Sequence, residues 1–281
     1  MVGNKLLVKQ RLDTLLVEKG LCPSRQQAQR LIRAGEVKID QTIFDKPGTL
    51  VPQDATITLK QKPPFVSRGG EKLAKAIKTF GIDLEGKVCL DGGISTGGFT
   101  DCLLQAGAAR VYGVDVGYGQ VAWKIRQDPR VVLKERTNIR HLKPDNLYED
   151  DNLPTLGVMD VSFISLTKVL PAFWNLLATP REVVLLVKPQ FEVGKEKIGK
   201  KGVVRSAKDQ ADAIFQVNQA AKSLGWRYRG LTWSDTVGPA GNIEYLLWMS
   251  SQLSAKASDL EEDWPTFESI CELTKAAREA L

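Results

Sequence analysis

The chain has 281 residues, of which 43% are hydrophobic, and carries a formal net charge of +6. This length fits two ordinary domains, and the composition is typical of a globular protein rather than a disordered one. Its four cysteines show neither the paired spacing of a zinc site nor a disulfide framework, so we expect no bound metal. No segment approaches the ~18 consecutive apolar residues of a membrane span, and no apolar run follows Lys5 and Lys9 as in a secretion signal. We therefore expect a cytoplasmic protein.

The charge is unevenly distributed along the chain. Residues 1–64 hold 11 Lys or Arg against 6 Asp or Glu, whereas residues 251–281 hold 3 against 7. The positive excess in a small first segment suits a polyanionic partner. The last segment, 251–281, is predicted to be an acidic C-terminal tail with a helix near 266–280 that serves packing or solubility.

Residues 1–60 predict a small α+β domain. Leucines at helical spacing end at Gly20, and Ser24 is a good N-cap for a second helix over 25–34, which Gly35 terminates. Apolar positions then alternate at 37 and 39 and again at 57 and 59, as in short strands. Lys62-Pro63-Pro64 predicts a stiff connection, and we assign residues 61–70 to a linker.

Residues 71–250 alternate helices with apolar strands, which predicts an α/β fold with a mostly parallel, doubly wound, Rossmann-like sheet. We expect helices over 72–80 and 207–223 and strands over 88–90, 111–114, 131–133, 156–159, 183–187, 228–236 and 245–248. Ligands of such sheets bind at the carboxyl ends of the strands. Asp115, Asp160 and Lys188 stand at three of these ends and are therefore candidates for a site.

A glycine loop follows the first of these strands and precedes a helix, as in nucleotide-binding turns. Asp115, at the end of the next strand, can accept hydrogen bonds from both hydroxyls of a ribose. The loop lacks the lysine of a P-loop and the G-x-G-x-x-G pattern of dinucleotide sites, and Asp91 suits a cationic ligand such as S-adenosylmethionine. We assign this cofactor to Asp91, Gly92, Gly93, Ser95, Thr96, Gly97, Gly98, Phe99, Asp115, Asp160 and Asn138, the last bordering the adenine.

Two other interpretations of the loop remain. It can be a tight turn without a ligand, although its pairing with an acid at the next strand end disfavours this. Gly93-Ile94-Ser95-Thr96-Gly97 also matches the nucleophile elbow of hydrolases. That chemistry needs a histidine late in the chain, whereas the single histidine, His141, precedes the fourth strand of the sheet and is expected to lie on the surface.

Several stretches resemble a known family. Residues 65–73 (FVSRGGEKL), 95–101 (STGGFTD), 160–166 (DVSFISL), 188–192 (KPQFE) and 241–245 (GNIEY) resemble the FtsJ-like, or RrmJ-like, ribose 2′-O-methyltransferases. With its first domain, the chain resembles the TlyA (hemolysin A) family of ribosomal RNA methyltransferases. The first domain itself is similar to the S4 RNA-binding domain, through Arg11-Leu12-Asp13, Gly20, Ser24-Arg25, Ala28, Leu31-Ile32, Gly35 and Val37.

The S4 resemblance implies that basic side chains of this domain contact RNA phosphates, which positions the protein without specifying sequence. These side chains are Arg11, Arg25, Arg30, Arg33 and Lys38. Arg68 and a Gly- and Lys-rich segment after Lys188, which we expect to be a mobile loop, add Lys195, Lys200, Lys201 and Arg205. A merely solvated basic helix face, or a loop without a role, is the alternative.

The FtsJ-like resemblance implies a catalytic tetrad of Lys72, Asp160, Lys188 and Glu244. A ribose 2′-hydroxyl is a poor nucleophile that must be aligned with the methyl group and relieved of its proton. We expect Lys188 to be the general base, kept neutral by partial burial and by the neighbouring cation Lys72. Asp160 would orient this lysine and face the methyl donor, and Glu244 would hold Lys72 and the ribose.

Three functions compete at this point. The first is an S-adenosylmethionine-dependent ribosomal RNA 2′-O-methyltransferase, acting on cytidine as family members do, with ribosomal RNA or subunits as partner and a monomeric state favoured. The second is an RNA-binding ribosome-assembly factor with weak or no catalysis, which the intact tetrad disfavours. The third is a membrane-active hemolysin, which the missing secretion signal, spanning helix and basic amphipathic helix disfavour.

Overall fold

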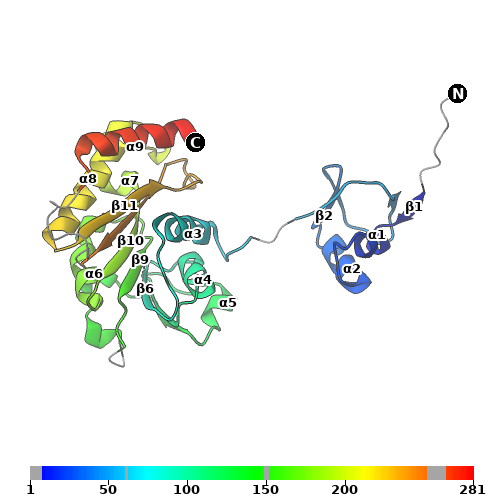
Figure 1. The fold of residues 1–281 in the computed structure, drawn as a ribbon, viewed down its shortest axis with the longest axis horizontal. Coiled ribbons are helices and arrows are strands. Elements are labelled where there is room, and N and C mark those ends of the chain that lie inside the picture. Colours follow the sequence, from blue (N-terminus) through cyan, green and yellow to red (C-terminus); the bar gives the residue numbers. More distant parts are fainter. Residues whose placement is uncertain (1–7, 61–62, 149–151, 252–263) are drawn as a thin grey trace. The chain divides into compact units, whose positions relative to one another are not determined.

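The computed structural model describes residues 8–60, 63–148, 152–251 and 264–281 (Figure 1). The chain divides into two compact units, Met1–Pro63 and Pro64–Leu281. The expected linker residues 61 and 62 and the tail segment 252–263 lie outside the described residues. Arg68, Gly69 and Gly70, which we assigned to the linker, instead form the first turn of helix α3, Arg68–Phe80, within the second unit.

The first unit packs two helices against short strands. Helices α1, Leu12–Glu18, and α2, Arg25–Arg33, end before Gly20 and Gly35, which both have φ near +70° (+69° and +68°) as helix-ending glycines do. The Ser24 hydroxyl accepts a hydrogen bond from the Gln27 amide, as its predicted capping role requires. The strands are β1 (Lys9–Arg11), β2 (Val37–Ile39), β3 (Thr42–Phe44), β4 (Leu50–Pro52) and β5 (Ile57–Leu59), in sheets ordered β1-β4 and β3-β2-β5.

One buried carboxylate ties the helices of this unit together. Asp13 is fully buried and accepts hydrogen bonds from Arg11, Arg25 and Gln29, with nitrogen to oxygen distances between 2.8 and 3.1 Å. Although burial opposes ionisation, these three donors hold the pKa of Asp13 well below its usual range. Two of the arginines expected to contact RNA therefore also serve the packing of the unit, while their outer faces remain about half exposed.

The second unit is built on a seven-stranded sheet in the order β11-β12-β10-β9-β6-β7-β8. Neighbouring strands from β10 to β8 are parallel, and β12 is antiparallel to both β10 and β11. The strands are β6 (Val88–Gly92), β7 (Arg110–Val114), β8 (Val131–Lys134), β9 (Leu156–Met159), β10 (Glu182–Val187), β11 (Arg227–Trp233) and β12 (Tyr245–Ser250). The predicted mostly parallel sheet is thus confirmed, with each strand close to its expected place.

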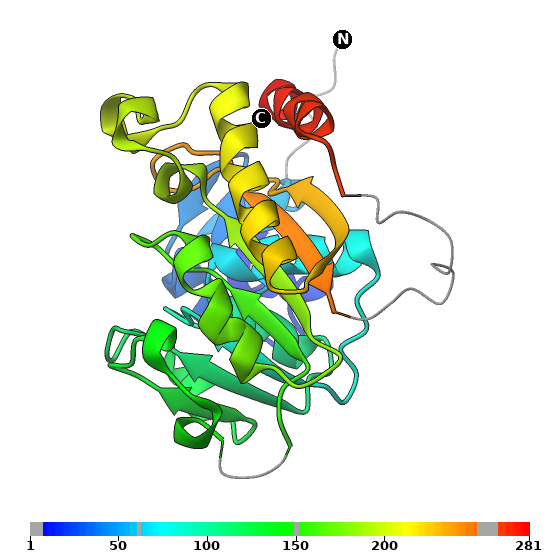
Figure 2. The same ribbon diagram turned by 90° about the vertical axis from the view of Figure 1, so that its left-hand side faces the viewer.

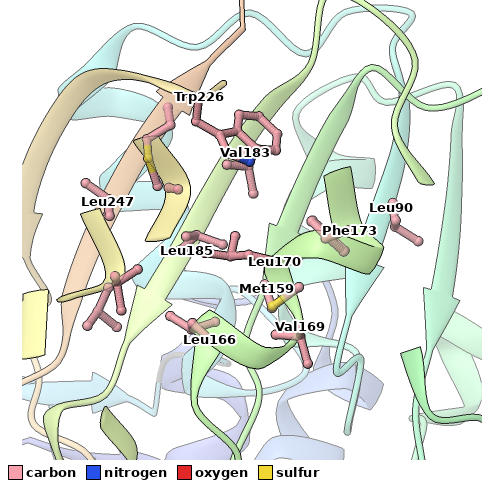
Figure 3. Packing of buried hydrophobic residues seen from close by; sticks show 14 of the residues in the cluster. Leu90, Met159, Leu166, Val169, Leu170, Phe173, Val183, Leu185, Trp226 and Leu247 are labelled. Carbon is pink, nitrogen blue, oxygen red and sulfur yellow. The ribbon is translucent and has the colours of Figure 1, made fainter. Parts of the chain in front are cut away.

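Helices cover both faces of the sheet, because strand side chains alternate between two apolar clusters. One cluster packs α3, α4 (Gly98–Gln105) and α5 (Trp123–Arg126) on one face. The other packs α6 (Leu170–Leu176) and α8 (Ala207–Ser223) on the opposite face and includes Phe173, Leu185 and Trp226 (Figure 3). The central strands are consequently covered on both faces, and the loops at their ends are held on a rigid frame.

The C-terminal helix is part of this core. Helix α9, Phe267–Ala280, lies beside α8 (Figure 2). Ile270 and Ala277 are buried in the same cluster, and the Thr274 hydroxyl donates to the Ala207 carbonyl at 2.9 Å. The helix expected near 266–280 therefore contributes packing rather than a free acidic appendage.

Replacing Asp13 with Asn should destabilise the first unit by about 1–2 kcal/mol at pH 7, because the buried ion pairs are lost but their arginines stay solvated. The Asp13 contribution is present above the ordinary carboxyl pKa of 3.8 and is lost as the pH falls further, since its folded pKa is lowered. The difference between wild type and variant should therefore shrink in acid. Hydrogen exchange over residues 12–33 of the full chain measures it, with the exposed Asp54→Asn as control; equal protection in wild type and Asp13→Asn contradicts the account.

Candidate active site

Three strand ends converge on the glycine loop. The Asp160 amide donates to the Gly92 carbonyl at 3.0 Å, and the Gly93 amide donates to the Val114 carbonyl at 2.8 Å. Gly93 has φ +85°, and a β-carbon there would lie 2.6 Å from the Asp160 carbonyl oxygen. Only glycine fits this position, so the ends of β6, β7 and β9 are locked into close contact.

Asp115 is fixed by backbone donors on two sides. Its Oδ2 accepts from the Ser95 amide and its Oδ1 from the Gly117 amide, both at 2.7 Å. Ser95 itself takes a left-handed φ of +49° to make this contact. The carboxylate is thereby held in one orientation, while each oxygen keeps a lone pair for the hydroxyls of a ribose.

Asp91 is the most deeply buried acid near the loop. The Thr100 hydroxyl donates to its Oδ2 at 2.6 Å, whereas its Oδ1 has no hydrogen-bond partner among the described residues. Burial raises the pKa of Asp91 to about 7. A cationic ligand nearby would offset that cost, so the unsatisfied carboxylate fits a positively charged sulfonium compound.

Two cavities meet beside Asp160. The first, of about 540 Å³, is lined by Lys72, Asp160, Lys188 and Glu244, together with the loop residues Gly93 to Thr96, Gly98 and Phe99. The second, of about 440 Å³, is lined by Asp115 and Asn138 and by apolar side chains including Ile139 and Val161. Both are bordered by Gly93, Ser95, Asp160, Ser162 and Phe163.

The four predicted catalytic side chains form two ion pairs. Lys188 Nζ lies 2.5 Å from Asp160 Oδ1, and Lys72 pairs with Glu244. The lysines are largely withdrawn from solvent, with side chains 12% and 10% exposed, and Glu244 is only 2% exposed. Asp160 thus lies beside Lys188 and Glu244 beside Lys72, while the catalytic roles expected of these side chains stay predictions. Both pairs face one cavity next to the glycine loop.

Some of the remaining predicted residues line one of the two cavities and others do not. Gly92 and Gly97 are buried, like Asp91, and none of the three lines either cavity. These residues therefore shape the glycine loop without facing the cavities. Arg68 and Lys201 line the larger cavity. The other basic candidates of this unit, Lys195, Lys200 and Arg205, are exposed and line neither of the two cavities.

The Gly- and Lys-rich segment, which we expected to be a mobile loop, is anchored at both ends. It forms two short 3-10 turns, Lys195–Lys197 and Lys200–Gly202. Lys197 pairs with Asp212, and buried Asn242 bridges the Val204 amide and the Gly202 carbonyl at 2.9 Å each. Lys201 is therefore held at the cavity rim.

Several cavity residues escaped the sequence analysis. Phe163 has φ +65° and is 93% exposed, an unusual position for an aromatic side chain, and its ring lies 5.2 Å from that of Phe191. Ser162, Gln190 and Asn242 also line the larger cavity. All five stand within the stretches that carry the family resemblance, but residue type alone gave no role to them.

Family models match both units of the chain. Residues 65–251 match the FtsJ-like methyltransferase and residues 10–57 match the S4 domain. The chain belongs to the FtsJ-like methyltransferase family. The fold and the predicted resemblance are thereby confirmed, and the methyl donor of this enzyme is S-adenosylmethionine.

Individual relatives extend the match over nearly the whole chain. The "16S/23S rRNA (cytidine-2'-O)-methyltransferase TlyA" of Mycobacterium tuberculosis is 47% identical over 88% of this chain and 93% of its own. "Hemolysin A" of Brachyspira hyodysenteriae is 39% identical over 84% of this chain and 98% of its own. A solved structure from Streptococcus thermophilus is 40% identical and superposes with a TM-score of 0.71, covering 98% of this chain and 97% of that one.

Two features are absent from the described part of the chain. No helix there combines the length and apolar character needed to cross a bilayer. Likewise, no group of three or more His, Cys, Asp or Glu side chains among those residues is placed to hold a metal ion.

Replacing Gly93 with Ala should weaken S-adenosylmethionine binding at least tenfold, because the new methyl group would displace the Asp160 carbonyl. Gly86→Ala is the matched control: Gly86 has a similar φ of +69° but open space around it, so only backbone strain is added. Calorimetric titration of both variants checks this. Equal affinity in Gly93→Ala and Gly86→Ala would show that the close contact does not shape the cofactor site.

Proposed function

We propose that this protein transfers a methyl group from S-adenosylmethionine to the 2′-hydroxyl of a cytidine ribose in ribosomal RNA. One observation carries the proposal: the Lys188–Asp160 and Lys72–Glu244 pairs line one cavity, which adjoins a second cavity at Asp160. The TlyA relative's name supports the choice of ribosomal RNA and cytidine.

The two cavities suit the two ends of the reaction. Asp115, with its fixed carboxylate, and Asn138 would receive the ribose and adenine of the donor in the smaller cavity. Asp91 would offset positive charge from behind the loop. The bound donor supplies an electrophilic methyl group, which would then lie near Asp160, one of the residues that border both cavities. The larger cavity is left for the ribose of the RNA.

The side chains of the larger cavity supply the proton chemistry. Lys188 in its neutral form takes the proton of the 2′-hydroxyl as the oxygen attacks the methyl carbon, and the carbon–sulfur bond breaks. Asp160 holds the amine and stabilises the ammonium that results. The Lys72–Glu244 pair places a cation and a carboxylate against the ribose and orients its hydroxyls.

The basic side chains would hold the RNA. Arg30, Arg33 and Lys38 of the S4 unit, with the outer faces of Arg11 and Arg25, would contact phosphates. In the methyltransferase unit, Arg68 and Lys201 would act at the cavity, and Lys195, Lys200 and Arg205 on the surface beyond it. We propose that the protein acts on ribosomal RNA in the cytoplasm. We also propose that it acts as a monomer, since residues of its second unit line both cavities.

Replacing Lys188 with Ala should reduce methyl transfer at least 1,000-fold while changing the dissociation constant of S-adenosylmethionine less than threefold, because the base is lost but the glycine loop stays intact. Purified ribosomal subunits, tritiated cofactor and nuclease mapping of the labelled nucleotide measure this. Lys275→Ala, which changes an exposed lysine of α9 outside both cavities, is the control and should lose little of the maximal rate. Near-normal turnover by Lys188→Ala would refute the base assignment. A wild-type protein that binds subunits but transfers no methyl group would instead favour the function of a ribosome-assembly factor.

A further inference from the structure

Ser162 lies beside the amine of Lys188. Lys188 Nζ donates to Ser162 Oγ at 3.0 Å and contacts Asp160 Oδ1 at 2.5 Å. Ser162 is two residues after Asp160 and borders both cavities. No role was assigned to it from the sequence.

The local backbone turns this hydroxyl toward the lysine. Phe163 takes a left-handed φ of +65°, a conformation that is uncommon for a residue of its size. Its ring projects outward and is 93% exposed, while the preceding hydroxyl meets Lys188. The turn therefore separates two neighbouring side chains, sending the polar one to the catalytic amine.

A second contact fixes this turn relative to Lys188. The Glu192 carboxylate accepts hydrogen bonds from the Ser165 hydroxyl at 2.6 Å and from the Leu166 amide at 2.9 Å. Glu192 ends the short helix α7, Pro189–Glu192, which begins directly after Lys188. Two contacts thus join the segment that carries Ser162 to the segment that carries Lys188. One is between Ser162 and the Lys188 amine, and the other is between Ser165, Leu166 and the Glu192 carboxylate.

The chemistry of an amine gives this arrangement a purpose. A neutral lysine amine has two N–H bonds and one lone pair, and it accepts a proton only through the lone pair. Ser162 Oγ accepts a hydrogen bond from this amine, and Asp160 Oδ1 contacts it from a second side as its ion-pair partner. With the amine held by these two oxygens, rotation about the terminal carbon–nitrogen bond is restricted, and the lone pair is directed to the remaining position.

We propose that Ser162 is a positioning residue that, with Asp160, aims the lone pair of Lys188 at the ribose hydroxyl. This inference rests on the proposed function, in which Lys188 is the general base. During transfer the hydroxyl proton moves to Lys188 Nζ, the oxygen–methyl bond forms, and the carbon–sulfur bond breaks with its electron pair left on sulfur. The ammonium that results keeps its bonds to Asp160 and Ser162.

Replacing Ser162 with Ala tests this. The single-turnover rate of methyl transfer to purified subunits should fall about 10- to 100-fold, because the amine regains rotation. The dissociation constants of S-adenosylmethionine and of subunits should change less than threefold. Ser162→Thr keeps the hydroxyl and should restore most of the rate.

A double-mutant cycle separates positioning from a direct contact or a structural role. If Ser162 acts through Lys188, Ser162→Ala should cause no more than a twofold further loss in a Lys188→Ala background. A further loss of tenfold or more, or weaker subunit binding with an unchanged rate, would overturn the inference. So would a wild-type rate in Ser162→Ala.

Different outcomes test the assignment of Lys188 as the base and the positioning role of Ser162. If Lys188→Ala is inactive and Ser162→Ala is fully active, the proposed function stands and the role of Ser162 is wrong. If Lys188→Ala retains wild-type turnover, the proposed base is wrong whatever Ser162 does. Thermal unfolding of each variant is followed alongside, and a Tm within about 3 °C of wild type shows that lost rate is not lost fold.

Discussion

The close contact between Gly93 and the Asp160 carbonyl is the constraint on which the rest of the site depends. It joins the ends of β6 and β9, and the bond from the Gly93 amide to the Val114 carbonyl adds the end of β7. The glycine loop, Asp115 and Asp160 therefore cannot move independently. Since Asp160 also pairs with Lys188, the same contact connects the glycine loop with the proposed base.

Burial and pairing then set the chemical character of the site. Two lysines are withdrawn from water beside carboxylates, and one oxygen of the deeply buried Asp91 has no hydrogen-bond partner in the part of the chain that the structure describes. Burying any one of these charged groups without an opposite charge would cost free energy of folding. Together they form a surface prepared for a cationic donor and a hydroxyl that must lose a proton. Because each buried lysine is offset by a carboxylate, many charged groups can stand at one edge of an otherwise apolar sheet.

Sequence periodicity could predict the frame because its signals are local. Strand ends at Asp115, Asp160 and Lys188 follow from apolar runs that stop at a charged residue, and helix ends follow from glycines such as Gly20 and Gly35. What periodicity could not predict depends on distant partners or on backbone strain. Asp13 depends on donors from strand β1 and helix α2, Asn242 depends on the loop that it bridges, and Phe163 has an unusual φ. The roles of Lys72 and Glu244 came from the family resemblance, since no local pattern pairs residues so far apart.

The proposed modification of ribose in ribosomal RNA is tested most directly by mapping 2′-O-methylation in ribosomal RNA from cells with and without the gene. The account predicts that at least one cytidine 2′-O-methyl group disappears when the gene is deleted and returns with the wild-type gene. It also predicts that a gene carrying Lys188→Ala, expressed at the same level, does not restore it. An unchanged map after deletion, or full restoration by the lysine variant, would contradict the account.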